Sequence, residues 1–166
     1  MEIAELNTLD QDSFINSLGW VFEDSPWVAA RVWFHRPFSN LESLHAAMTA
    51  EVESASEAEQ IQLLRSHPDL GTRARIADAS ASEQARAGLD SLTAREFEQL
   101  QQLNSAYKAK FGFPFLLAVK GSTKSDIVRN LEQRINRPRE VEFREALRQV
   151  YRIAEFRLRD TLEEVR

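Results

Sequence analysis

The sequence contains no cysteine among its 166 residues, and this absence excludes several kinds of chemistry. It rules out disulfides, a thiolate nucleophile, and every zinc or iron–sulfur site built on cysteine ligands. Only three histidines are present, and no two of them have the close spacing of metal ligands on one helix or strand. The sequence therefore predicts no metal site.

Long apolar runs are also missing, although apolar residues make up 43% of the chain. No stretch approaches the roughly 20 consecutive apolar residues that a membrane span needs. The start, MEIAELNTLDQD, lacks the basic and apolar segments of a signal peptide, and the end, LEEVR, is not a targeting tripeptide. We therefore expect a cytoplasmic protein that does not contact a membrane.

Helix signals recur along the chain, and strand signals hardly occur. Ser56 and Thr93 each begin a capping box, with a glutamate three residues later. After Pro138, apolar residues at helical spacing run from Phe143 to Leu162 and form one continuous stripe. The chain has a usual length for one domain, and its glycines and prolines mark no linker. The sequence predicts a single all-α domain, residues 1–166, of about seven or eight helices.

Residues 111–119, FGFPFLLAV, break the helical pattern. The segment is apolar and contains both Gly112 and Pro114, so we expect an irregular or extended stretch buried among helices. Core packing is the simplest interpretation of its side chains. Its backbone N–H and C=O groups would lack helical partners, however, and a flat ligand with amide edges could pair with them.

The charges are unevenly distributed along the chain. Residues 1–64 carry 11 acidic and two basic side chains, whereas residues 65–166 carry 19 basic and 15 acidic ones. A basic second half is compatible with nucleic acid, a small anion, or a surface that faces the acidic half. The arginines of residues 129–159 alternate with glutamates, including Glu132, Glu140, Glu142, Glu145 and Glu155, which is typical of an ion-paired, solvated helix surface. We expect no nucleic-acid partner.

His67 is the most informative histidine. It precedes Pro68, so the helix over residues 57–66 should stop here, because a residue before proline is pushed out of the α region. The carbonyl end of a helix stabilises an imidazolium, which suits a general acid. The alternative is that His67 has only a structural role at a helix end.

Glu83 lies in the segment SASEQ. Ser80 and Glu83 have the spacing of a capping box, and in that case Glu83 only caps a helix. In the functional alternative, Glu83 and Gln84 lie at a helix N-terminus, where free N–H groups can hold an anion or a polar ring.

Arg157 lies on the last helix, about 80° from the centre of the apolar stripe. An arginine at such a boundary usually packs its stem on the core and pairs with an acid. It can also hold a substrate carboxylate through two hydrogen bonds.

Six segments, in order, resemble one known family over nearly the whole chain: LNTLDQDSF, ARVWFHRPFSNLESL, HPDLG, SEQARAGL, LNSAYKAKFGFPF and KSDIVRNLEQR. The family is 2-oxo-4-hydroxy-4-carboxy-5-ureidoimidazoline (OHCU) decarboxylase, and HPDLG and LNSAYKxKFGFPF are its specific motifs. The resemblance implies an all-α, cofactor-free and commonly dimeric enzyme. It acts in urate degradation and converts OHCU to S-allantoin and carbon dioxide.

The resemblance also implies site residues. His67 matches the catalytic histidine of the family and Glu83 its acidic partner. Residues that match substrate contacts are Pro68, Ser80, Ala81, Ser82, Gln84, Phe115, Leu116, Leu117, Ala118, Val119 and Arg157. The stretch between HPDLG and SEQ, TRARIADASA, is shorter than in the family and differs from it, which affects the match at Ser80 and Ala81.

The chemistry of OHCU agrees with the absence of a cofactor. Its carboxylate is on a carbon that bears a hydroxyl and adjoins a ring C=N, which can accept the electron pair when carbon dioxide leaves. Two rivals remain open at this point. One is a non-enzymatic helical adaptor that uses the apolar stripes and the FGFPF segment to bind a partner. The other is a related ureide-processing lyase with another substrate.

Overall fold

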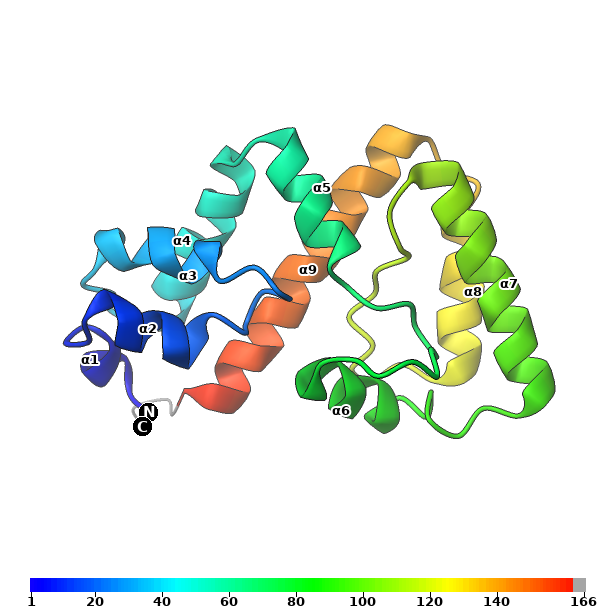
Figure 1. Cartoon of the computed structure of the whole chain (residues 1–166), viewed down its shortest axis with the longest axis horizontal. Coiled ribbons are helices and arrows are strands. Elements are labelled where there is room, and N and C mark those ends of the chain that lie inside the picture. The colour runs from blue at the N-terminus through cyan, green and yellow to red at the C-terminus, as the bar shows by residue number, and fades with distance from the viewer. Residues whose placement is uncertain (163–166) are drawn as a thin grey trace. The chain divides into compact units, whose positions relative to one another are not determined.

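The computed structural model describes residues 1–162, and every regular element in them is a helix (Figure 1). This confirms the all-α class. The described residues form nine α-helices and one short 3-10 helix, because α1 (Ile3–Leu6) precedes the helices that the pattern predicted. The chain divides into two compact units, described one by one below. The single domain over residues 1–166 stays a prediction.

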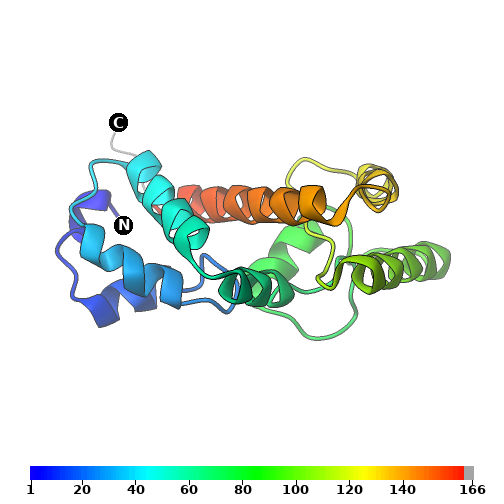
Figure 2. The same ribbon diagram turned by 90° about the horizontal axis from the view of Figure 1, so that it is seen from above.

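Unit 1 consists of Met1–Ser66 and the chain from Val150 onwards. After α1 it contains α2 (Gln11–Leu18), α3 (Trp27–Val32), the 3-10 helix η1 (Trp33–His35), α4 (Leu41–Ser54) and α5 (Glu57–Arg65). Helix α3 packs against α2 and α4, which are drawn in blue to cyan in Figures 1 and 2. The fully buried side chains of this unit include Phe14, Leu44, Met48 and Val52.

The starts of these helices follow the capping signals of the sequence. The Asn40 side chain accepts from the Ser43 N–H at 2.8 Å, and Ser56 accepts from the Glu59 N–H at 3.1 Å. Residues 27–35, which follow the helix-start signal Ser25-Pro26, do not form one continuous α-helix, because α3 ends at Val32 and the chain tightens into 3-10 geometry at Trp33. A tightened last turn is a usual way to satisfy terminal carbonyl groups.

Unit 2 consists of His67–Gln149. It contains α6 (Asp78–Arg86), α7 (Ala94–Phe111), α8 (Lys124–Arg134) and the first part of α9 (Arg139–Thr161). Helices α7 and α8 pack against each other (Figure 1). The core is aromatic: the Tyr107 ring centroid lies 4.5 Å from that of Phe111 and 5.4 Å from that of Phe115.

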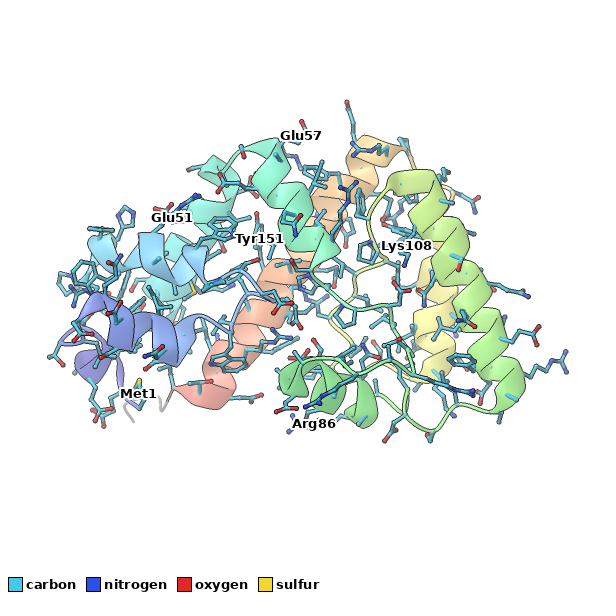
Figure 3. All side chains as sticks on the ribbon, in the orientation of Figure 1. Met1, Glu51, Glu57, Arg86, Lys108 and Tyr151 are labelled. Carbon is cyan, nitrogen blue, oxygen red and sulfur yellow. The ribbon has the colours of Figure 1, made fainter. Side chains whose placement is uncertain are left out.

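Helix α9 has 23 residues and contributes to both units. Its predicted stripe is confirmed, because Leu147, Val150, Ala154 and Leu158 are all buried. Tyr151, on the part that belongs to unit 1, is labelled in Figure 3, and its hydroxyl donates to Glu53 at 2.8 Å. No helix in the described part of the chain is long and apolar enough to span a membrane.

The segment after α7 is irregular, as the sequence predicts. Gly112 ends the helix with a left-handed φ of 81°, a conformation that favours glycine. Residues 113–119 have no helical or strand structure, and all seven are buried.

Candidate functional site

His67 begins unit 2, directly after the end of α5. That helix stops at Arg65, with Ser66 as its C-cap, so the predicted stop before Pro68 is confirmed to within one residue. His67 is only 8% exposed. It therefore lies on a non-helical segment with its side chain largely removed from solvent.

The turn that follows His67 is held by side chains from two helices. The Gly71 N–H donates to the Gln84 side chain of α6 at 2.9 Å, and the Asn104 amide of α7 donates to the Leu70 carbonyl at 2.9 Å. An ion pair joins Lys108 of α7 to Asp69 at 3.1 Å. Three consecutive residues of the HPDLG motif are thus bound by side chains from two of the other five family segments, SEQARAGL and LNSAYKAKFGFPF.

Gly71 is required by the geometry of this turn. Its φ is +77°, and the Thr72 N–H donates to the Asp69 carbonyl at 3.3 Å, which is the pattern of a type II turn. A Cβ atom at Gly71 would lie 2.6 Å from Cδ2 of Leu100, a side chain that is itself buried. Glycine avoids both the strained dihedral angle and the steric overlap.

We expect Gly71→Ala to lower the free energy of unfolding by about 2–4 kcal/mol, from left-handed strain and overpacking. Gly121→Ala is the matched control. Its φ is +80°, but nothing lies within 4 Å of an added Cβ. Urea denaturation should show a smaller loss for Gly121→Ala, of about 1 kcal/mol, from strain alone. Equal losses for the two variants would contradict the steric argument.

Helix α6 begins earlier than the sequence predicts. Its N-cap is Ala77, so Ser80 is the third helical residue, and the capping box from Ser80 to Glu83 is wrong. Glu83 and Gln84 consequently lie inside the helix and not at its N-terminus. The reason is that the first turn begins at Asp78, whose acidic side chain suits that position.

One face of α6 is turned into unit 2. Ser80 and Gln84, four residues apart, are 5% and 7% exposed, and Glu83 is half-buried. Ala81 and Ser82 are exposed, as helical spacing requires. Gln84 bonds the turn beyond His67, so the two catalytic candidates, His67 and Glu83, lie on segments that are hydrogen-bonded to each other.

The backbone of residues 115–119 is partly satisfied by side chains. Arg134 donates to the Leu116 carbonyl at 2.6 Å, and the Ala118 N–H donates to Gln149 at 3.0 Å. Within residues 1–162, the N–H and C=O groups of Leu117 have no hydrogen-bond partner. Alternate residues of an extended segment turn their polar groups to opposite sides. The unpaired polar groups of Leu117 therefore face the side opposite Arg134 and Gln149.

A buried ion pair supports this segment, and the sequence interpretation missed it. Glu142 is 0% exposed and accepts three hydrogen bonds from Arg134, which is 2% exposed. Tyr107 donates its hydroxyl to the same carboxylate at 2.5 Å. Burial, and then this hydrogen bond, raise the pKa of Tyr107, so the phenol stays protonated. The prediction of a solvated, ion-paired surface is wrong for Arg134 and Glu142.

The sequence does contain a signal for Glu142. It precedes Ala146 by four residues and Val150 by eight, and both are buried. Helical spacing thus places Glu142 on the buried stripe of α9. Burial of its carboxylate is possible because Arg134, eight residues earlier, supplies the charge partner.

Arg157 lies in unit 1 and is 3% exposed. Its guanidinium pairs with Glu23 at 2.9 Å and donates to the Trp20 and Val21 carbonyls at 3.2 and 3.3 Å. The expected packing of the stem with an acidic partner is confirmed, and the partner is Glu23, which sequence reasoning did not single out. The turn before α3 therefore orients Arg157.

Two cavities of unit 2 are lined by other residues. One, of about 310 Å³, lies between α7 and α8, with Leu100, Lys124 and Val128 in its lining. The other, of about 250 Å³, is lined by residues 69–74 and by side chains of α7. None of the predicted site residues lines either cavity. Among the described residues, no group of three or more His, Asp or Glu side chains is placed to hold a metal ion.

Comparison with known proteins decides the family. The family model described as OHCU decarboxylase matches residues 7–159. This chain belongs to the OHCU decarboxylase family. The resemblance inferred from the six sequence segments is thereby confirmed.

Relatives within the OHCU decarboxylase family match almost all of this chain. The 2-oxo-4-hydroxy-4-carboxy-5-ureidoimidazoline decarboxylase of Haloferax volcanii is 47% identical and is aligned over 95% of this chain and 94% of its own length. The uric acid degradation bifunctional protein PucL of Bacillus subtilis is 46% identical over 96% of this chain, which spans 32% of that longer protein.

A solved structure of the same fold supports the assignment. The crystal structure of an (S)-allantoin synthase superimposes with a TM-score of 0.81 and 31% sequence identity. The match covers 98% of this chain and 54% of that one, so this chain spans about half of the synthase.

Proposed function

We propose that this chain decarboxylates OHCU to S-allantoin and carbon dioxide in urate degradation. Membership of the OHCU decarboxylase family and 47% identity to a named decarboxylase support this function. One structural observation carries the assignment of the site: the turn that presents His67 is fastened to α6 and α7, and α6 also carries Glu83. A histidine held in this way suits proton transfer, which requires a fixed geometry.

The reaction needs little from the protein beyond binding and proton handling. When the bond from carbon to the carboxylate breaks, carbon dioxide leaves and the electron pair forms an enol-like intermediate as the ring C=N accepts charge. Glu83 and His67 polarise the hydroxyl of the substrate and exchange protons with this intermediate. Protonation of the neighbouring carbon from one face then produces the S enantiomer. We propose that the reaction uses no cofactor, because the substrate contains its own electron sink.

Substrate binding is proposed to use the backbone of residues 115–119 and the buried face of α6. The free N–H and C=O of Leu117 can pair with the amide edges of the ring and the ureido group, while Phe115 and Val119 flank that position. Arg134 and Gln149 hold Leu116 and Ala118 from the other side. Pro68 and Ser80, beside His67 and Glu83 in the chain, complete the proposed contacts in unit 2.

Arg157 is proposed to orient the anionic substrate through its guanidinium. Its hydrogen bonds to Glu23 and to two carbonyl groups fix the plane of the guanidinium, which favours a specific binding direction. Ala81 and Ser82 are the weakest members of the proposed set, because both are exposed on α6. From the family resemblance alone, we also propose a cytoplasmic homodimer.

A coupled assay tests the function. Urate is converted by urate oxidase and hydroxyisourate hydrolase, with or without this protein, and circular dichroism follows the chirality of allantoin. We expect the protein to accelerate formation of S-allantoin over the spontaneous, racemic background. No acceleration, from a folded protein, would refute the decarboxylase activity and favour either a lyase for another ureide or a non-enzymatic adaptor.

A further inference from the structure

Asn104 is placed to control the turn that presents His67. It lies in the interior of α7, is 3% exposed, and reaches 34 residues back along the chain to donate to the Leu70 carbonyl. Leu70 is three residues after His67, and Pro68 stiffens the stretch between them. A buried carbonyl without a donor is unfavourable, so the Asn104 amide determines where this turn can lie.

Stability alone does not explain an asparagine at this position. Its side-chain oxygen, Oδ1, is buried and has no hydrogen-bond partner within residues 1–162. Asparagine also favours a helix interior less than leucine does. Leucine has the same branched arrangement of heavy atoms and would leave no buried acceptor unpaired. The one contact that leucine cannot make is the hydrogen bond to Leu70.

The contacts of the residues on either side of Leu70 also hold this turn in place. Gln84 accepts from the Gly71 N–H, and Lys108 pairs with Asp69. Lys108 lies one helical turn beyond Asn104 on the same face of α7, and Figure 3 labels it. Lys108 is 47% exposed in its side chain, so its ion pair is weak and Asn104 is the stronger of the two attachments to α7.

We propose that Asn104 is a positioning residue for His67. This inference rests on the proposed function, in which the His67 imidazole handles protons. Asn104 binds Leu70, this contact fixes the turn over residues 67–71, and the turn fixes the imidazole. Loss of the contact leaves the substrate-binding groups of α6 and of residues 115–119 in place, but lets His67, and Pro68 beside it, move from their productive positions.

The test compares Asn104→Leu with the wild-type protein. We expect kcat for OHCU to fall about 10- to 100-fold, because a small misplacement of a reacting group has effects of this size, while KM changes less than about threefold. NMR titration of the histidine side chains should show a displaced and broadened His67 signal. Hydrogen exchange of the Gly71 amide should accelerate about tenfold.

Asn7→Leu is the matched control. Asn7 also donates a long-range 2.9 Å hydrogen bond to a backbone carbonyl, that of Phe38, but it lies in unit 1. This control should lose stability without a specific fall in kcat. Lys108→Met is a second test that does not disturb the core, and it should lower kcat about two- to fivefold.

The outcomes distinguish a failure of the positioning role of Asn104 from a failure of the proposed decarboxylase function. An Asn104→Leu protein that folds and keeps normal kcat, with an unchanged His67 signal, overturns the positioning role. The positioning role is also overturned if Asn7→Leu shows the same fall in kcat, or if Asn104→Leu raises KM without lowering kcat. If wild-type protein does not decarboxylate OHCU, the proposed function fails. NMR and hydrogen exchange still decide whether Asn104 positions His67. If Asn104→Leu does not fold, the Lys108→Met result decides, and unchanged kcat and exchange in that variant count against the proposal.

Discussion

Replacing His67 with glutamine is expected to lower kcat for OHCU by about 10²- to 10⁴-fold, the usual contribution of a general acid or base. Glutamine keeps a polar side chain of similar reach but does not titrate near neutral pH. The proton that His67 exchanges with the enol-like intermediate would then have to come from water. Circular dichroism should show a correspondingly slower increase of the S-allantoin signal, because more of the product then comes from the spontaneous, racemic reaction.

His45→Gln is the control for that experiment. His45 also makes a hydrogen bond, between its Nε2 and the Tyr151 carbonyl at 2.8 Å, but that contact lies in unit 1. The His45→Gln variant should retain kcat within about threefold of the wild type if the loss of activity is specific to His67. Near-normal turnover by a folded His67→Gln protein would remove His67 from the mechanism. Equal losses in both variants would point to a general loss of structure.

Replacing Glu142 with leucine is expected to lower the free energy of unfolding by about 3–5 kcal/mol, the usual result of breaking a buried ion pair from one side. The Arg134 guanidinium would remain buried without its carboxylate, and the Tyr107 hydroxyl would lose its acceptor. Urea denaturation at neutral pH measures the difference. Glu155→Ala, which breaks the exposed pair with Arg159 on the same helix, should change stability by about 0.5 kcal/mol or less.

A double variant shows whether the buried charge is the cause. Arg134→Met combined with Glu142→Leu removes both charges, and a hydrophobic pair of similar volume is often as stable as a buried ion pair. The double variant should therefore be more stable than Glu142→Leu alone. It should remain below the wild type, because the Leu116 carbonyl loses its donor. The single variant Arg134→Met completes the comparison. If the stability loss of the double variant equals the sum of the losses of Arg134→Met and Glu142→Leu, the two residues do not depend on each other.

The His67 and Glu142 variants test different parts of the proposed site. His67 is proposed to carry out the proton transfer, whereas Glu142 acts through Arg134 on the backbone of residues 115–119. A folded variant of Glu142 should therefore bind substrate less tightly, while changes around His67 should mainly lower kcat. This split between KM and kcat separates the binding segment from the catalytic turn.

Much of the helical framework could be predicted because its signals are local. Ser56 and Thr93 each cap the helix that follows them, as their spacing indicated. The α6 start could not be read in the same way, since Ser80 offered a capping box that the chain does not use. A capping pattern describes one possible local arrangement, and the burial of Ser80 together with the hydrogen bond between Gln84 and Gly71 favours a helix that begins at Asp78.

By itself, the sequence determined the all-α class, the stop of α5 before Pro68, the buried irregular segment and the family. Each depends on neighbouring residues, on helical spacing or on motif order, which a linear chain carries directly. Only the tertiary structure decided which partners satisfy the buried polar groups. Glu142, Asn104 and Glu23 have partners eight, 34 and 134 residues away. These pairings form only when the chain folds, so neither local spacing nor motif order shows them.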